Sequence, residues 1–438
     1  MKRIIALLLV AVMCIGLVSC MPNLKKFAIR FANDKIGITE DDINSDEYLA
    51  FSEKLESFSS KISADIYKKY GANSNFCISP ASIYMSLAIA AECSTGETRQ
   101  EILDALGMSY EELSTYTKYF YSLHNSEYKY LDENGKEGIS ATETLISSIW
   151  LDSSLGYNPS AVEYLASNYN CDVFGASFSS SAAKKMINQY IEYKTDGAIA
   201  GNLTIKSNLS FAIISAMALH EIWNDIGREL SLTFDSHNFV ESDGTTSSTQ
   251  LLRGHYSNGK VYESDKYSTF FIESEHGYRL HFIVPTEEYT LKDVFTSNII
   301  SEVIARDDYG YIDDENGEIN YTRILFPPIS SSFSADISEL LTQKYGIESL
   351  FDEENCDFST LVTDKVSCNA FLHHNRLNIT SGGINSSSVK IKSSTATSPE
   401  LPEYKEIYNE FLIDRAFGFV LTDENGMILY SGVINELN

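Results

Sequence analysis

The sequence is short of basic residues, prolines and glycines, and each shortage excludes a class of protein. Only 33 of its 438 residues are Lys or Arg, against 61 Asp or Glu, so its formal net charge is −28. A surface of that sign repels phosphate backbones, and we therefore expect no nucleic-acid partner. With 8 prolines and 24 glycines the chain is neither collagen-like nor linker-like. Its 43% hydrophobic content is that of a globular protein with a large core.

The cysteines are also few and widely spaced. Five of the seven lie beyond residue 20, an odd number, and no two of them form a C-x-x-C pair. Zinc sites need closely spaced ligands, and a chain of this length needs neither metal nor disulfides for stability. We therefore expect no metal site and no cofactor.

Long apolar runs are almost absent too, and the one that exists stands at the N-terminus. Lys2 and Arg3 precede the apolar run 4–18. A spanning helix needs about 20 apolar residues, so this run is shorter than a comfortable membrane span. A basic start followed by such a run is typical of a signal peptide.

The end of that run, Leu17-Val18-Ser19-Cys20, resembles a bacterial lipobox. The resemblance implies cleavage after residue 19 and a lipid on Cys20, which would anchor the protein to a membrane without spanning it. The alternative is an ordinary secretory signal cut near Ser19. We expect a signal peptide at 1–19, a tether at 20–48, and an extracytoplasmic lipoprotein anchored at a bacterial cell surface.

Beyond residue 48, the apolar pattern predicts helices first and strands later. Helical spacing begins at about Glu47, and a second apolar helix runs from Ser79 to Cys93, where Pro80 suits a helix start. The apolar run 211–219 indicates a buried strand, short strands dominate 232–285, and 417–435 resembles a hairpin. Because regular β-α-β alternation is missing, we predict one α+β domain over 49–438.

One long segment fits neither pattern. Residues 384–402 contain six serines, two prolines and no aromatic residue, and they lie between two strand-like segments near the C-terminus. Loops of this length without structure are usually functional or disordered. The alternative interpretation is a surface insertion without a role.

Signatures of catalysis are weak. The sequence has no H-E-x-x-H, G-x-S-x-G or Walker motif. Ser181 and Lys184 match the S-x-x-K of penicillin-interacting enzymes, but no S-D-N accompanies them. The K-T-G-like stretch 194–197 falls in the same short helical region, which cannot supply opposite walls of an active site. We interpret both matches as chance and predict that the protein is not an enzyme.

A series of motifs from about residue 50 to the end resembles the serpin family. Each segment is given with the serpin pattern that it resembles: 75–83, N-x-F-x-S-P-x-S-I; 95–103, G-x-T-x-x-x-I; 216–223, N-A-I-Y-F-K-G-x-W; 373–384, H-K-A-x-x-x-V-x-E-E-G-T; 411–417, F-x-A-D-x-P-F; 430–433, F-x-G-x-V. The resemblance implies the serpin fold: α+β, with three β-sheets, about eight to nine helices and an exposed reactive loop at about 383–410.

The resemblance also implies a mechanism. A serpin's loop is cleaved by a serine protease, which becomes covalently bound as the freed loop inserts into a central sheet and releases stored strain. Gly383 would be the hinge glycine, fifteen residues before a reactive bond at Thr397-Ser398. A shift of one residue would select Ala396-Thr397 instead. Both bonds offer a small uncharged residue, which suits an elastase-like or subtilisin-like protease better than a trypsin-like one.

The hinge and the sheet opening depart from the family pattern in places. The implied hinge is Gly383, Ile384, Asn385, Ser386, Ser387, Ser388 and Val389, and the implied sheet-opening residues are Ser79, Ser82, Ser215, Trp223 and His373. Ser215 stands where the family has asparagine. Alternation from Ile384 would point Lys390 and Lys392 at the core, where unpaired charge is costly. A register slip of one residue would bring Val389 and Ile391 inward instead.

We therefore predict a monomeric serine protease inhibitor that traps its target covalently at the cell surface. The alternative is a non-inhibitory serpin-fold lipoprotein that binds a ligand or partner, and the hinge departures favour it. A surface hydrolase is a third hypothesis, for which the sequence offers no site. For His373 and Trp223 we expect structural roles, as a hydrogen-bonded histidine and a packing residue.

Overall fold

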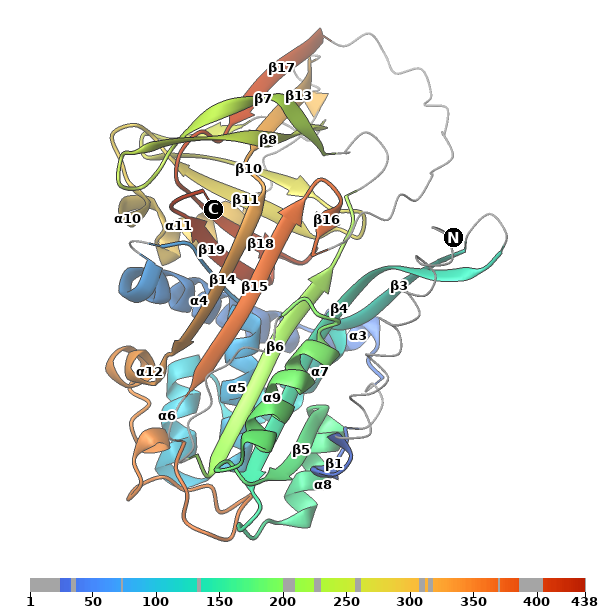
Figure 1. Cartoon of the computed structure of the whole chain (residues 1–438), viewed down its shortest axis with the longest axis vertical. Coiled ribbons are helices and arrows are strands. Elements are labelled where there is room, and N and C mark those ends of the chain that lie inside the picture. The colour runs from blue at the N-terminus through green and yellow to red at the C-terminus, as the bar shows by residue number, and fades with distance from the viewer. Residues whose placement is uncertain are drawn as a thin grey trace.

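The computed structural model describes residues 24–32, 37–71, 74–131, 135–199, 209–223, 230–256, 261–306, 312–313, 318–368, 371–385 and 405–437. The predicted signal peptide and Cys20 lie outside these residues. Within them the chain mixes helices and sheets as predicted (Figure 1). Ten α-helices are described, against the eight or nine expected. Two of them, α3 (Glu40–Ile43) and α10 (Leu291–Val294), are single turns too short to give a periodic apolar pattern.

The helices of the N-terminal half begin and end where local chemistry dictates. The Ser79 side chain caps α5, and Pro80 occupies its first turn. Gly107 ends α6 in the left-handed conformation with φ 65°. All fourteen residues of α5 are buried, so this helix runs through the interior. The helices of this half are α4 (Asp46–Ile66), α5 (Pro80–Cys93), α6 (Gly96–Leu106), α7 (Tyr110–Leu123), α8 (Pro159–Asn168) and α9 (Ser181–Lys194).

Two separately paired groups of strands, of five and three strands, lie on either side of a division and are together called the central sheet. On one side β6 (Phe211–His220) pairs with β4 (Glu137–Asp152), which also pairs with β3 (Asn125–Leu131) and, in parallel, with β5 (Cys171–Ala176). On the other side β14 (Ile329–Asp336) pairs with β15 (Leu372–Thr380), which pairs with β16 (Gly383–Ile384). The strands β14, β15 and β6 run side by side in Figure 1, with α9 over the β6 half.

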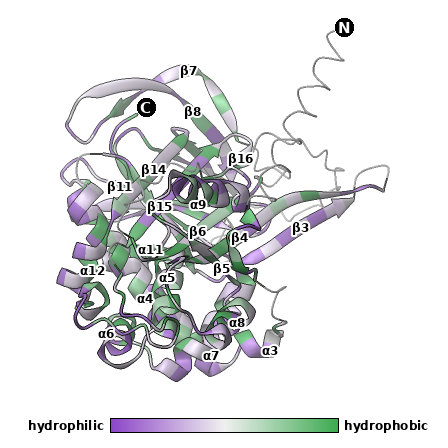
Figure 2. Ribbon diagram, turned by 60° about the horizontal axis from the view of Figure 1, so that its bottom comes forward, coloured by the Kyte–Doolittle hydropathy of each residue, from purple (hydrophilic) through white to green (hydrophobic). Residues whose placement is uncertain are grey.

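A second sheet forms the hydrophobic centre of the molecule. Its order is β2 (Phe76–Ile78), β19 (Ile428–Ile434), β18 (Phe417–Thr422), β11 (Arg279–Pro285), β10 (Tyr267–Glu273) and β9 (Tyr262–Glu263). The strands β18 and β19 are buried throughout and form the C-terminal hairpin that the sequence predicts. Hydrophilic segments, purple in Figure 2, lie on outer turns such as those of α6 and of α12 (Ser338–Tyr345).

A third sheet lies at the end of the molecule farthest from α6 and α8, and it contains the first described residues after the predicted loop (Figure 1). Its strands are β7 (Ser231–Val240), β8 (Thr246–Tyr256), β13 (Glu318–Phe326) and β12 (Ile312–Asp313). Next to β13 and parallel to it runs β17 (Lys405–Leu412), the first described segment after the loop (Figure 1). The helix α11 (Ser297–Ile304) packs near α4 and the second sheet.

Part of the predicted tether packs against the folded body. The strand β1 (Ala28–Arg30) pairs with β5, Arg30 forms an ion pair with Glu163 of α8 at 2.8 Å, and the Ala32 N–H donates to Asp172 at 2.7 Å. This stretch therefore adds an edge to the central sheet instead of extending away from it. Among the described helices, none combines the length and the apolar character that crossing a bilayer would demand.

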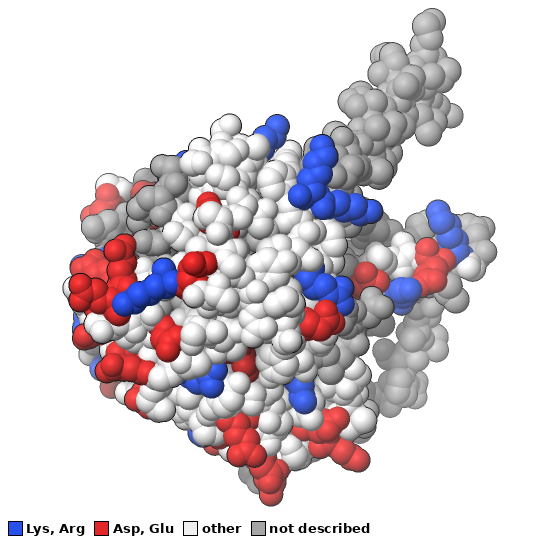
Figure 3. Space-filling view, turned by 90° about the horizontal axis from the view of Figure 1, so that it is seen from below, with Lys and Arg blue, Asp and Glu red and all other residues white. Residues whose placement is uncertain are grey.

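Charged side chains are distributed over the surface. On the face shown in Figure 3, acidic groups outnumber basic ones and are scattered between uncharged areas. The acidic groups are thus spread out on this face, which fits a generally solvated acidic surface.

Candidate functional site

The central sheet is open between β6 and β15. β6 is paired along its length with β4, and β15 with β14, from Ile329 opposite Ile379 to Asp336 opposite Leu372. Among the described residues, the pairing across the opening is limited to a bridge between Glu221 and Ile384 at its upper end. Within the described residues, two strand edges therefore face the same opening without a strand between them below Asn385, and such edges are templates for another strand.

The first two residues of the predicted hinge, Gly383 and Ile384, occupy the upper end of this opening. Ile384 lies opposite Ile379 of β15, and it exchanges two backbone hydrogen bonds with Glu221, of 2.9 and 3.0 Å. Its side chain is fully buried. Gly383 precedes it with φ 140°, a conformation that L-residues rarely adopt, so the chain turns here only because this position is glycine. Asn385 follows, whereas Ser386–Val389, Lys390, Lys392 and Ala396–Ser398 lie outside the described residues.

Ser79, Ser82 and His373 meet beneath the opening. The Ser79 N–H donates to Nε2 of His373 at 3.2 Å, and the Ser82 N–H donates to Oγ of Ser79 at 3.2 Å. Burial lowers the pKa of His373 to about 3, with a further contribution from the neighbouring His374. His373 is therefore a neutral hydrogen-bond acceptor that ties β15 to the start of α5, in line with the structural role that we expected.

Ser215 and Trp223 lie on the other side of the opening and above it. The hydroxyls of Ser215 and Ser147 are 3.2 Å apart, so the pair links β6 to β4. The indole N–H of Trp223 donates to the Thr380 carbonyl at 2.8 Å, which fixes the turn that leads into the hinge. Trp223 is 5% exposed and thus packs at the top of the sheet as predicted.

A buried hydrogen bond between a carboxylate and an imidazole at the top of β6 was not anticipated from the sequence. The Glu221 carboxylate is fully buried, and both of its oxygens lie 3.0 Å from Nδ1 of His276. Burial raises the pKa of Glu221, while His276 lowers it. The sequence did contain a sign of this contact, since Glu221 stands where the serpin pattern has glycine.

Asn375 is a second residue that the sequence analysis overlooked. It lies on β15, is fully buried, and neither its Nδ2 nor its Oδ1 has a hydrogen-bond partner among the described residues. Buried polar groups normally find partners, so an unpaired amide marks a place where another group can bind. Asn375 replaces the alanine of the pattern H-K-A, and this departure was visible in the sequence.

The enzyme-like motifs do not form an active site. Ser181 is exposed at the start of α9, and the Thr195 hydroxyl donates to the Ile191 carbonyl at the end of that helix. Lys194 forms an ion pair with Asp172 at 2.9 Å. No cluster of metal-ligating side chains occurs in the part of the chain that the structure describes, and the five cysteines described there are buried and form no disulfide with one another.

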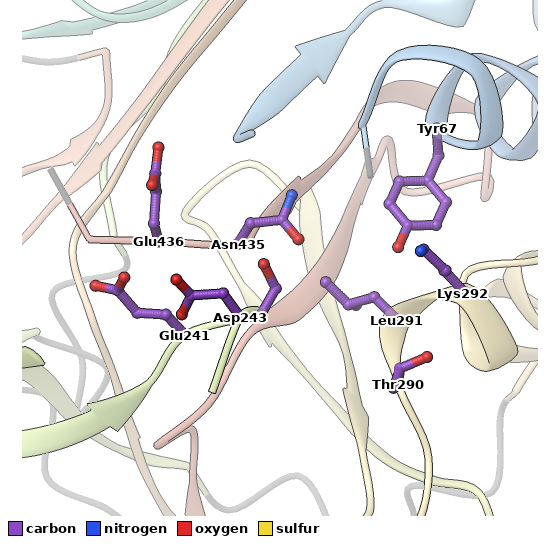
Figure 4. Close-up of a pocket in the computed structure, with 9 residues that line it drawn as sticks. Tyr67, Glu241, Asp243, Thr290, Leu291, Lys292, Asn435 and Glu436 are labelled. Carbon is purple, nitrogen blue, oxygen red and sulfur yellow. The ribbon is translucent and has the colours of Figure 1, made fainter. Parts of the chain in front are cut away.

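A surface cavity of about 360 Å³ lies away from the opening, between the end of α4, the start of α10 and the C-terminus (Figure 4). Glu241, Asp243 and Glu436 lie at one end of the view, and Tyr67 and Lys292 at the other. The Thr290 hydroxyl donates to the Asp293 carboxylate at 2.7 Å, but this bond belongs to the N-terminal cap of α10 and so has a structural role. The opening of the central sheet is the better candidate for function.

Comparisons with known proteins identify the family of the chain. The family model described as Serpin (serine protease inhibitor) matches residues 53–437. The native-state structure of tengpin, a thermophilic serpin, aligns with a TM-score of 0.68 at 20% identity and covers 93% of this chain and 98% of its own. Serpin-ZX of Arabidopsis thaliana is 25% identical over 300 residues, which are 64% of this chain and 71% of that protein. Corticosteroid-binding globulin of Oryctolagus cuniculus is 31% identical over 128 residues, which are 29% of this chain and only 32% of that protein.

Fold and site together define an α+β protein whose central sheet is open and holds Gly383 and Ile384 at the top of the opening. The match over residues 53–437 shows that the chain belongs to the serpin family. Most serpins inhibit proteases, and some are non-inhibitory.

Proposed function

We propose that this serpin is a suicide inhibitor of serine proteases. The observation that carries the proposal is the seating of Ile384 between Glu221 and Ile379, at the top of two strand edges that are otherwise unpaired within the described residues. A cleaved loop that continued from Ile384 would complete the sheet and satisfy both edges. The main-chain hydrogen bonds gained in this way supply a driving force for insertion.

The position of Ile384 also defines a register for the inserted loop. Ile384 faces the main core, so in an extended strand every second residue after it would face the same side. Lys390 would then lie between Ser215 and His373, and Lys392 would lie beside Ile213 of β6. The hydroxyls of Ser215 and Ser147 offer acceptors for the Lys390 ammonium, and nearby Asn375 offers a carbonyl oxygen that lacks a partner. A register slip of one residue would break the pairing of Ile384 with Glu221 and Ile379.

The target that fits best is an elastase-like or subtilisin-like serine protease. It would attack Thr397-Ser398, or Ala396-Thr397 one residue earlier, and stay attached as an acyl-enzyme on a monomeric inhibitor. We further propose that Cys20 carries a lipid that anchors the protein to the surface of a bacterial cell, since the segment that ends at Ser19 resembles a lipobox. Loss of fatty-acid labelling in Cys20→Ala, with labelling of the unchanged chain, tests the anchor.

The inhibitory function is tested by mixing the purified protein with each protease class and separating the products on a denaturing gel. We expect an SDS-stable band at the summed mass. Thr397→Pro should abolish it, because a proline ring at 397 blocks both candidate bonds. Glu400→Pro is the matched control, which places the same ring beyond the bond and should leave the band in place.

The alternative is a non-inhibitory serpin that binds a partner, and the two lysines of the loop favour it, since buried charge opposes insertion. Melting of the protein after loop cleavage separates the two. Insertion should raise the melting temperature strongly, because the completed sheet is more stable. Clean cleavage with neither a covalent band nor a rise in melting temperature would support the alternative.

A further inference from the structure

Asn385 has an unusual backbone conformation immediately below the seated hinge. Its φ is 49°, and it is one of three non-glycine residues with positive φ among the described residues. Asparagine tolerates this left-handed region better than most residues, yet the conformation ends any extended strand. The strand formed by Gly383 and Ile384 therefore stops at this residue.

The Asn385 side chain spans the opening. Its Nδ2 donates to the Leu219 carbonyl of β6 at 3.0 Å, and its Oδ1 accepts from the Asn378 N–H of β15 at 2.9 Å. Its own N–H donates to the Asn378 carbonyl at 2.8 Å, and its carbonyl oxygen lies 3.0 Å from Nδ1 of His220. One carboxamide thus binds both facing edges at once.

These two bonds occupy the positions that a longer inserted strand would need. In the antiparallel ladder that Ile384 begins, the Asn378 N–H would be bound by the main-chain carbonyl of Asn385, and the Leu219 carbonyl would receive the N–H of the following residue. The carboxamide supplies an acceptor and a donor in place of those two groups. It therefore imitates one peptide unit of the missing strand.

We infer that Asn385 is a positioning residue that holds the hinge at Ile384 and slows insertion of the loop. The inference rests on the proposed inhibitory function. For the strand to lengthen, residue 385 must return to an extended conformation, and both side-chain bonds must break before main-chain bonds replace them. Because the bonds are exchanged one for one, Asn385 controls the rate of insertion more than the stability of the inserted state.

The surroundings of Asn385 support this role. His220, the last residue of β6, has Nδ1 3.0 Å from the Asn385 carbonyl and Nε2 3.3 Å from the Thr195 carbonyl at the end of α9. The Asn385 carbonyl is thereby held toward β6, away from the Asn378 N–H that it must reach in an inserted strand. On the opposite side the turn before the hinge is fixed by the bond between Trp223 and Thr380.

The test follows the rate of loop insertion in the full chain after rapid cleavage by a saturating subtilisin-like protease. Trp223 contacts the hinge turn, so its fluorescence in a stopped-flow instrument reports the insertion. Asn385→Gly removes both side-chain bonds but keeps the left-handed conformation accessible, and we expect insertion about tenfold faster. Asn385→Ala also strains that conformation and should be at least as fast.

Asn170→Gly is the matched control, because Asn170 is another left-handed asparagine, with φ 43°, located before β5 and away from the opening. Its insertion rate should equal that of the unchanged chain. Hydrogen exchange of the uncleaved protein gives a second readout, since the Asn378 amide loses its acceptor in both Asn385 variants and should exchange faster there. Equal melting temperatures of the uncleaved chains would show that the variants fold.

The outcomes separate this inference from the proposed function. If the unchanged chain inserts and the Asn385 variants insert at the same rate, the role of Asn385 is refuted while inhibition stands. If the unchanged chain fails to insert but the variants do, Asn385 is a complete block, which supports the inference and argues against inhibition by the natural chain. If no chain inserts, both ideas are refuted.

Discussion

Acid should destabilise this protein through His373, which lies fully buried beneath the opening of the central sheet. Its Nε2 accepts the Ser79 N–H, which requires the neutral ring, and burial lowers its pKa from an ordinary value of about 6.5 to about 3. Because the pKa is lower in the folded state, the contribution of His373 to the free energy of unfolding is complete above about pH 6.5. This contribution is lost as the pH falls from there toward about 3. At pH 5 the free energy of unfolding should have dropped by about 2 kcal/mol through this residue alone.

The assay is urea denaturation of the unchanged chain and of His373→Gln at pH 7 and pH 5. Glutamine can still accept the Ser79 N–H but does not titrate. We expect the stability of the unchanged chain relative to the variant to fall by about 2 kcal/mol between the two pH values. Comparing the two chains cancels the pH dependence of groups that both contain, such as His124. Burial lowers the pKa of His124, but the neighbouring Glu143 raises it by more, so the net shift is upward.

Parallel pH dependence of the two chains between pH 7 and 5 would refute this reasoning, because it would mean that His373 takes up a proton in the folded state without penalty. The imidazole resonances give an independent check, and they should stay at their neutral positions down to pH 5. His281 is a second buried neutral histidine, whose pKa is lowered to about 3 by burial and by Arg279. The stability of the unchanged chain relative to His281→Gln should therefore also fall between pH 7 and pH 5, although His281 does not lie at the opening.

Three further predictions concern packing, thiols and the loop. Gly432→Ala should lower the free energy of unfolding by about 1–3 kcal/mol or more, because the added carbon would lie 2.3 Å from the Phe76 carbonyl oxygen. Gly175→Ala is the control and should lower it less, because its added carbon would meet only the Ile29 side chain, at 3.3 Å. Equal urea midpoints of the two variants would contradict this prediction. Cys356 should react with a thiol reagent before Cys77, Cys93 and Cys171 in the native protein, since burial raises its pKa to about 11, less than it raises theirs. Simultaneous reaction of these four thiols would instead indicate global opening. Lys390→Ser should raise the melting temperature of the cleaved protein and leave that of the uncleaved protein unchanged. If the melting temperature of the cleaved protein did not change, residue 390 would not be buried on insertion.

Local chemistry made much of the fold predictable. Ser79 and Pro80 mark the start of α5, the apolar run 211–219 coincides with β6 apart from its last residue, and the predicted hairpin corresponds to β18 and β19. These features depend on neighbouring residues only, through capping, apolar periodicity and turn chemistry. The single-turn helices α3 and α10 were not predicted, because they are too short to show a periodic apolar pattern.

The sequence by itself determined the family and the broad order of elements, and it predicted the position of the hinge, since motifs and apolar spacing can be read along the chain. Only the tertiary structure decided which atoms meet at the opening. Asn385 binds Leu219, 166 positions away, and Glu221 meets His276, 55 positions away. Such contacts depend on strand order and register, because a shift of one residue turns every side chain to the opposite face. The departures at Glu221 and Asn375 were visible in the sequence, but their consequences depend on a fully buried environment that only the packed sheets create.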